Sequence, residues 1–395
     1  MNQKDICDII IENTIKEWKN LMNIQNQREI WEVPKYSKSE INKAGSIIAD
    51  QSCTKEERDN AIIILNNWRA AHAYPLHVIC SNLRLRNPDA IVVQRLKRLE
   101  SITGKIERFP DMSLYRMQDL GGCRVIVDNI KQVYEAVNRY KTSRIRHILK
   151  REYDYIKNPK DSGYRSYHMV YQFHSDKKET YNKNMLIEIQ FRTKLQHIWA
   201  TAVEMMGIYT KSNLKSSQGD RDILRFFTLV SSFFAMKEDM TVCPDTSGWV
   251  DELISEIMQI EKRSNIIMKL KAINQAIQIT EYNENFYLKS GYYLLLLDYD
   301  DPSLNIYPFK QSDFELAIKS YNEMESEYTG KVDIVLVSVK SFETLKVAYP
   351  NYFIDISEFL NVLKSVMITY SYYNKNAKLF LEANYNILED GIPVG

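Results

Sequence analysis

The chain has 395 residues, 45% of them hydrophobic and 26% charged, with 52 Lys and Arg against 51 Asp and Glu. This length predicts two or three domains of about 150 residues each. No apolar run approaches the ~20 residues of a membrane span, and the amino terminus lacks a signal-peptide core, so we expect a soluble cytoplasmic protein with no membrane contact. The five cysteines contain no CxxC pair, which argues against a disulfide framework or a zinc site.

The charges are unevenly distributed along the chain. Residues 95–160 hold 16 Lys and Arg against 8 Asp and Glu, residues 1–94 are balanced, and the rest is net acidic. The middle of the chain should therefore attract anions, and the acidic C-terminal half could press against it.

Two helical regions precede the middle of the chain. Residues 4–32 carry a rough apolar stripe, and Thr54-Lys55-Glu56-Glu57 is typical of a capping box that starts a helix reaching Arg69. A second helical stretch follows Pro75. We expect these helices to cover one side of a sheet.

The segment 95–108 is the most basic part of the chain. If it is a helix, or a turn followed by a helix, Ser101, Lys105 and Arg108 share one side, with Arg95 and Lys97 just upstream. A polyphosphate could lie along that row. Taken alone, the segment is more typical of a solvated basic face, and only the neighbouring motifs favour a role in binding.

The next hundred residues alternate between strand and helix patterns. Asp119 and two glycines lead into an apolar run ending at Val127, and Glu188, Gln190 and Arg192 alternate with apolar neighbours and so share one face. The other predicted elements are a helix at 129–141, strands at 151–156, 167–173 and 185–191, a Pro/Gly loop at 154–168 and a helix at 194–206. This order predicts an α+β fold, a mixed β-sheet flanked by helices.

Beyond residue 210 the sequence predicts helices, then a small α/β domain. The predicted helices are 220–240, 249–280, 312–328 and two starting at 341 and 356; the predicted strands are 292–299, 305–309 and 332–339. The predicted domains are an N-terminal helical extension (1–50), a nucleotide-handling domain (51–210), a helical connecting region (211–284) and a small C-terminal α/β domain (285–395).

Four blocks within roughly residues 60–205 resemble the alarmone synthetase domain of the RelA/SpoT family, in the family's order. The blocks are Arg95-x-Lys97-x3-Ser101-x3-Lys105, Asp119-x4-Arg124, Asp154-Tyr155-x3-Pro159-Lys160-x2-Gly163-Tyr164-x-Ser166-x-His168, and Glu188-Ile189-Gln190-x-Arg192-Thr193 with Trp199-Ala200. The resemblance implies a nucleotidyltransferase-like fold and transfer of pyrophosphate from ATP to the ribose 3′-oxygen of GDP or GTP, with release of AMP.

Matched by motif, Asp119 and Glu188 would be the catalytic carboxylates and would hold Mg²⁺, with Glu188 also orienting or deprotonating the 3′-hydroxyl. Two carboxylates suffice because Mg²⁺ keeps several waters while it bridges phosphates. The implied ATP-binding residues are Arg95 and Arg124, stacked on adenine, and Lys97, Ser101 and Lys105 on the phosphates. The implied acceptor-binding residues are Tyr164, stacked on guanine, with Lys160, His168, Gln190 and His197.

The sequence leaves the acceptor and the control of the reaction open. Ser162 and Met169 depart from common family residues beside the acceptor pocket. The alternatives are a toxin-like relative that modifies adenine nucleotides or the 3′ end of tRNA, and a non-catalytic nucleotide-binding regulator. The first 90 residues lack the family's hydrolase signature, so we expect synthesis without degradation. Self-association also stays open, as does a regulatory ligand or protein that binds the C-terminal domain. We expect the acidic C-terminal half to regulate the catalytic centre, by occluding it or by sensing a partner.

Overall fold

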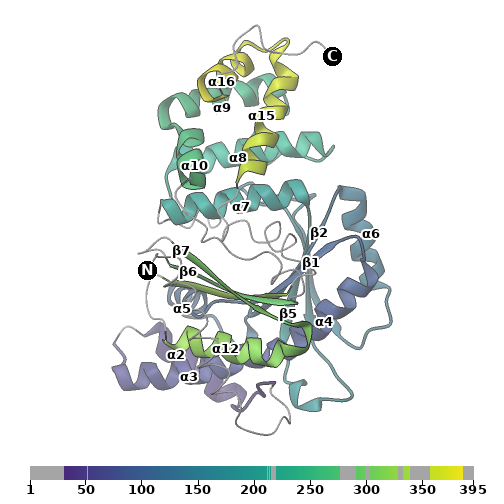
Figure 1. Cartoon of the computed structure of the whole chain (residues 1–395), viewed down its shortest axis with the longest axis vertical. Coiled ribbons are helices and arrows are strands. Elements are labelled where there is room, and N and C mark those ends of the chain that lie inside the picture. Colours follow the sequence, from purple (N-terminus) through teal and green to yellow (C-terminus); the bar gives the residue numbers. More distant parts are fainter. Residues whose placement is uncertain are drawn as a thin grey trace, which may run out of the picture. The chain divides into compact units, whose positions relative to one another are not determined.

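The middle of the chain forms a five-stranded mixed sheet. Its strands are β1 (Ile91–Leu96), β2 (Gly121–Val127), β3 (Ile148–Asp154), β4 (Tyr167–Gln172) and β5 (Leu186–Thr193), in the spatial order β1-β2-β5-β4-β3. Figure 1 labels β1, β2 and β5 among them. β2 and β5 run parallel, whereas the other neighbours run antiparallel. The predicted α+β fold with a mixed sheet is therefore confirmed.

The computed structural model describes residues 31–50, 52–210, 212, 214, 219–275, 291–298, 303–327, 332–338 and 356–385. The described residues from Glu32 onward belong to one compact unit. The predicted helix at 4–32 lies outside the described residues except for its last two positions, and the predicted helix starting at 341 lies outside them as well. None of the helices in the described ranges combines the length and apolarity that a bilayer crossing requires.

Helices flank the sheet as the sequence predicts. They are α2 (Lys38–Ala49), α3 (Lys55–Ala71), α4 (Ala73–Arg86), α5 (Leu99–Arg108), α6 (Ile130–Lys141) and α7 (Lys194–Tyr209), with short 3₁₀ turns at Leu114–Arg116 and Glu179–Tyr181. The predicted capping box of α3 is present, since the Thr54 hydroxyl accepts from the Glu57 N–H and Glu57 accepts from the Thr54 N–H. α4 and α6 contact each other and lie against β1, β2 and β5.

The basic segment 95–108 differs from its predicted form. Arg95 and Leu96 end a strand that the sequence analysis did not predict, and α5 begins only at Leu99. The β-branched run Ile91-Val92-Val93, after the turn residues Asn87-Pro88-Asp89, is the signal that would have predicted β1. It pairs antiparallel with β2, so Ile91 faces Ile126 and Leu96 faces Gly121.

A second, three-stranded sheet lies beside the first. Its strands are β6 (Tyr292–Asp298), β7 (Ser303–Phe309) and β8 (Val332–Ser338), in the spatial order β7-β6-β8. Between β7 and β8 the chain forms a 3₁₀ turn at Gln311–Asp313 and then α12 (Phe314–Glu327), which packs on all three strands. β8 contacts β1, the edge strand of the large sheet. The small sheet thus lies against the side of the large sheet where the basic segment begins.

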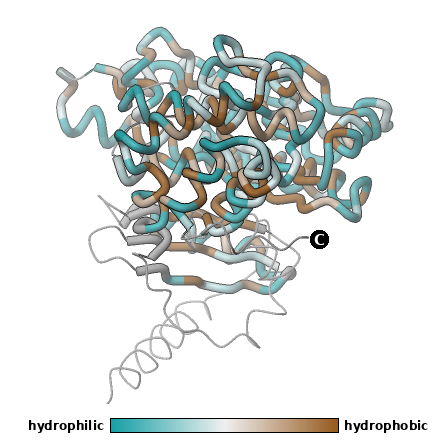
Figure 2. Tube along the Cα trace, turned by 90° about the horizontal axis from the view of Figure 1, so that it is seen from above, coloured by the Kyte–Doolittle hydropathy of each residue, from teal (hydrophilic) through white to brown (hydrophobic). Residues whose placement is uncertain are grey.

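The remaining helices share one apolar core with α7. They are α8 (Arg221–Lys237), α9 (Val250–Ser264), α10 (Ile266–Gln275), α15 (Ser357–Ser371) and α16 (Lys375–Tyr385). Brown and teal alternate along these helices in Figure 2, as expected for helices with one apolar face. The helix predicted over 249–280 is interrupted at Asn265, whose φ of 49° ends α9 in the left-handed region.

Within its described residues, the region predicted as a C-terminal domain (285–395) makes contacts in two places. Its strand β8 contacts β1 and α12 packs on its sheet, whereas its last two helices join the core of α7 to α10. The reason is apolar packing: Phe359 of α15 lies with its ring centroid 6.0 Å from that of Phe227 and 5.8 Å from that of Phe234, both on α8.

Candidate active site

The strand register gathers polar side chains on one face of the large sheet. Arg95, Gly122 and Glu188 are register partners across β1, β2 and β5. In the neighbouring row, Arg124 pairs with Gln190, which in turn pairs with His168 of β4. Since directly paired residues, and residues two apart on one strand, point to the same side of a sheet, all of these side chains share one face.

A cleft of about 450 Å³ opens on this face. It is lined by Val93, Arg95, Lys97, Asp119, Gly122, Cys123, Arg124, Glu188 and Gln190. The structure therefore brings together both predicted carboxylates and four of the predicted nucleotide-binding side chains. Gly122 lies between Arg95 and Glu188 in the register, and its missing side chain leaves the floor of the cleft open. A smaller hollow, lined by α7, α8 and the loop residues Gly163 and Arg165, contains none of the predicted site residues.

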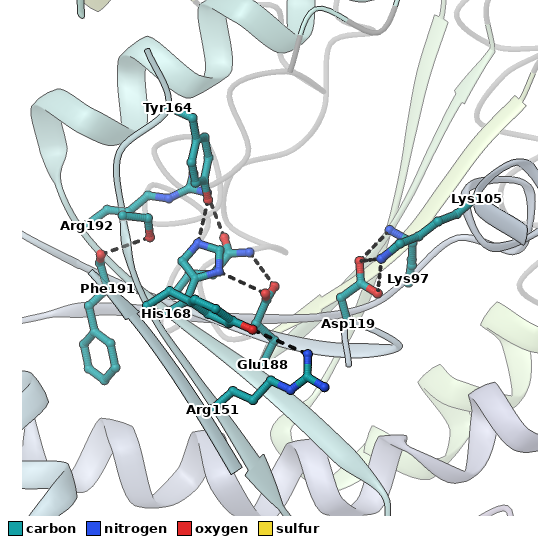
Figure 3. A network of polar contacts seen from close by, with 12 residues as sticks. Lys97, Lys105, Asp119, Arg151, Tyr164, His168, Glu188, Phe191 and Arg192 are labelled. Atoms are coloured by element: carbon teal, nitrogen blue, oxygen red, sulfur yellow. Dashed lines mark hydrogen bonds and ion pairs between the residues drawn. The ribbon is translucent and has the colours of Figure 1, made fainter. Parts of the chain in front are cut away.

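Asp119 stands at the start of β2 between two lysines. Its carboxylate oxygens lie 2.9 Å from Lys97 Nζ and 3.1 Å from Lys105 Nζ (Figure 3). Burial alone would raise the pKa of Asp119, but the two lysines outweigh it and lower that pKa to about 2. Burial in turn lowers the pKa of Lys97, and Asp119 offsets only part of that effect. This half of the cleft thus holds one carboxylate within a cationic environment.

Glu188 belongs to a hydrogen-bonded network on the other side of the cleft (Figure 3). Its carboxylate accepts from His168 Nδ1 at 3.0 Å and from Gln190 Nε2 at 2.7 Å. Arg192 donates to Gln190 Oε1 at 2.8 Å and also to the Tyr164 hydroxyl. His168 Nε2 lies 2.8 Å from the same hydroxyl, so the ring of His168 links Glu188 to Tyr164.

The charges of this network shift the acidities of its members. Burial opposes ionisation of Glu188, yet the hydrogen bond and charge of His168 lower the pKa of the carboxyl overall. Burial likewise opposes protonation of His168, but Tyr164 and Glu188 raise the pKa of the imidazole. Burial would raise the pKa of Tyr164, whereas Arg192 and then His168 lower it to about 7. The network therefore favours the ionised form of Glu188 and the protonated form of His168.

The loop at residues 159–166 is fixed by α7 and α8. Gly163 has a φ of +84°, and an added Cβ would lie 2.9 Å from Ser231 Cβ and 3.0 Å from the Trp199 ring. The Arg165 guanidinium is buried and donates to Ser231 Oγ at 3.2 Å and to the carbonyl of Ile156 at 3.0 Å. These contacts hold the loop that carries Lys160 and Tyr164.

The other predicted residues lie around the cleft rather than in its lining. Lys160 Nζ lies 5.3 Å from the ring centroid of Tyr164, whose side chain is only 8% exposed, so guanine stacking on that ring stays a prediction. Ser101 lies one turn before Lys105 on α5. His197 is buried on α7 and is not among the lining residues. Arg192 received no role from the sequence, although its alternation with Glu188 and Gln190 would have included it in the network.

The comparisons with known proteins concern the middle of the chain. Residues 94–214 match the family model described as a region found in RelA/SpoT proteins. The resemblance predicted from the sequence is therefore confirmed for these residues. This region contains β2 to β5, α5 and every predicted site residue.

Similar proteins of Bacillus subtilis carry the name GTP pyrophosphokinase. The chain is 34% identical to YjbM over 135 residues and 33% identical to YwaC over 134 residues. Each match covers 32% of this chain and 61% of the relative, so the chain spans less than two thirds of either relative.

Solved structures give a likeness over a larger share of their own chains. A GTP pyrophosphokinase family protein from Streptococcus pneumoniae matches at 27% identity with a TM-score of 0.36, covering 42% of this chain and 85% of that one. The small alarmone synthetase 1 of Bacillus subtilis, solved with its product pppGpp, matches at 24% identity with a TM-score of 0.36, covering 44% and 93%.

Proposed function

We propose that this chain transfers the β,γ-pyrophosphate of ATP to the 3′-hydroxyl of GDP or GTP and releases AMP. The observation that carries the proposal is the cleft itself, in which a carboxylate paired with two lysines faces a second carboxylate held by a histidine. A RelA/SpoT region and relatives named GTP pyrophosphokinase support the same reaction.

The cationic half of the cleft suits ATP. Arg95 and Arg124 line the cleft on either side of Gly122, which has no side chain, and their planar guanidinium groups can stack on adenine there. Lys97 and Lys105 both pair with the single carboxylate of Asp119. Two positive charges against one negative charge leave a net positive charge that can attract the phosphates of ATP. Attack at the β-phosphorus gathers negative charge on its oxygens, so fixed cations lower the barrier by electrostatic stabilisation.

The residues present also fit a magnesium ion. Asp119 and Glu188 offer oxygen donors in one cleft, the ligand type that Mg²⁺ prefers, and Mg²⁺ needs few protein ligands when phosphates and water complete its shell. In the described part of the chain no cluster of three or more His, Cys, Asp or Glu could hold a metal alone, which matches an ion bound together with its nucleotide. When bound, the ion would neutralise phosphate charge.

The other half of the cleft suits the attacking hydroxyl. The 3′-oxygen forms a bond to the β-phosphorus, the bond between that phosphorus and the α,β-bridging oxygen breaks, and AMP leaves with that oxygen. Glu188 is the group placed to accept the proton, since its carboxylate is ionised and His168 fixes its orientation. Gln190 donates to the same carboxylate, and Arg192 supports the network by donating to Gln190 and to the Tyr164 hydroxyl.

The test is to incubate purified full-length protein with labelled ATP and, separately, GDP, GTP, ADP and deacylated tRNA. We expect GDP or GTP to gain two phosphates while AMP appears in equal amount. Hydrolysis of ATP without any labelled acceptor would contradict the proposal. An Asp119→Ala variant that keeps the cellular effect of the wild-type protein would favour a non-catalytic nucleotide-binding regulator instead.

One observation favours the 3′ end of an RNA as a second candidate acceptor. The rings of Tyr153 and Tyr155 stack at 5.6 Å with an interplanar angle of 8°, and Tyr153 is 36% exposed at the end of edge strand β3. Arg151 lies beside Tyr153, and Lys160 lies 4.6 Å from the Tyr155 ring centroid. Aromatic rings flanked by cations are typical of single-stranded nucleic-acid binding. Transfer of label to deacylated tRNA in the same panel would select this candidate.

A further inference from the structure

Helix α5, which carries Lys105, begins at an N-cap residue of a type that rarely caps helices. Its N-cap residue is Arg98, which makes no side-chain capping hydrogen bond. The first N–H groups of a helix lack intrahelical partners and are usually satisfied by a nearby Ser, Thr, Asp or Asn. Here the backbone N–H of Leu99 donates instead to Glu325 Oε1, at 2.9 Å. Glu325 lies on α12, 226 residues further along the chain.

Glu325 is held in place by a buried arginine. The Arg69 guanidinium at the end of α3 has no exposed surface and forms an ion pair with Glu325. Arg69 also donates to the hydroxyl of Tyr321 at 2.6 Å, one helical turn before Glu325 on α12. A buried charge is tolerated only when it is paired and hydrogen-bonded, so this cluster fixes the position of the Glu325 carboxylate.

The cluster touches the chain where it enters the cleft. Arg69 approaches the carbonyl of Lys97 at 3.5 Å, and the N–H of Lys97 donates to the carbonyl of Leu120 at 2.7 Å. Lys97 and Arg98 connect β1 to Leu99, the first residue of α5. The side chain of Lys97 reaches Asp119. The position of both lysines relative to Asp119 therefore depends on a turn that Glu325 and Arg69 hold from outside.

We propose that Glu325 is a positioning residue that caps α5 and so places Lys97 and Lys105 for the phosphates of ATP. The inference rests on the proposed function and adds that the C-terminal sheet and α12 complete the ATP side of the site. Within the described part of the chain, every residue that lines the cleft lies between positions 93 and 190. The contact thus supports the cleft from behind rather than filling it, in contrast to the occlusion expected from charge alone.

A Glu325→Met variant of the full chain tests the proposal, with Glu323→Met as its matched control, because methionine keeps the length of the side chain but offers no oxygen to the Leu99 N–H. Glu323 lies on the same helix and pairs with Lys319 of that helix at 3.7 Å, an exposed pair of the kind that contributes little. For Glu325→Met we expect affinity for a non-hydrolysable ATP analogue and KM for ATP to worsen about five- to tenfold, the scale of one lost helix cap. KM for the acceptor should stay unchanged, and the Leu99 amide should exchange with solvent about as many times faster. Glu323→Met should match the wild type in all of these.

The proposal is overturned if Glu325→Met binds the ATP analogue as the wild type does, whatever the exchange of the Leu99 amide. If Glu325→Met does not fold because Arg69 is left unpaired, the double variant Arg69→Met, Glu325→Met removes that charge and still leaves the Leu99 N–H without its cap. It should fold and keep the weak ATP binding, and wild-type affinity in the double variant would refute the capping role. Analogue binding and amide exchange need no turnover, so a wild-type chain that binds the analogue but transfers nothing refutes the proposed function and leaves this test valid.

Discussion

Gly122 offers the sharpest test of the cleft, because its neighbour Gly121 supplies the control. An added Cβ at Gly122 would have the carbonyl oxygen of Glu188, at 4.0 Å, as its nearest neighbour, whereas one at Gly121 would lie 2.7 Å from Ile187 Cδ1. The two positions point to opposite faces of β2. A side chain at Gly122 therefore enters the cleft, and one at Gly121 enters the core beneath α4.

We expect Gly122→Val to fold normally and to lose nucleotide binding. Valine favours a strand over glycine on a scale of about 1 kcal/mol, so the melting temperature should stay or rise. Its methyl groups fill space between Arg95 and Glu188, and the clash with a bound nucleotide should cost about 1–3 kcal/mol. That range corresponds to roughly 5- to 150-fold weaker binding.

The assay is calorimetric titration with a non-hydrolysable ATP analogue, alongside thermal unfolding. The control Gly121→Ala should show the reverse pattern: a lower melting temperature because Ile187 must move, and ordinary affinity in the protein that remains folded. If Gly122→Val binds the analogue with wild-type affinity, the cleft is not where ATP binds, and the site assigned here fails.

Three further predictions concern the acceptor side. Glu188→Gln should lower the rate of AMP release about 10²- to 10⁴-fold while analogue binding persists, and undiminished release would exclude it as the base. Tyr164 has a pKa of about 7 in the folded protein, against 10 for an ordinary tyrosine. Its ionisation should therefore stabilise the fold increasingly as pH rises from 7 to 10, and this stabilisation is lost as pH falls through 7. Tyrosinate absorbance should show one step near pH 7 that is absent in Tyr164→Phe. Gly163→Ala should lower the melting temperature, whereas Gly104→Ala, whose Cβ meets nothing within 4 Å, should not.

The sequence by itself determined the chemistry of the individual segments. Alternation along β5 placed Glu188, Gln190 and Arg192 on one face, and the acidic residue before an apolar run placed Asp119 at the mouth of β2. These features depend on periods of two and on residues a few positions apart, which a local pattern records directly. Strand β1 was not predicted, because the basic residues at its end favoured a helix or a turn over the β-branched run before them.

Only the tertiary structure decided which segments meet. The parallel register of β2 and β5 sets Gly122 beside Glu188, and no local pattern in either strand specifies that partner. The same holds for Glu325. It lies in a helical pattern typical of a surface, yet its carboxylate accepts from the N–H of Leu99, 226 residues earlier at the start of α5. Such pairings depend on how complete elements pack and bury their charges, and that is a property of the folded chain rather than of any stretch of its sequence.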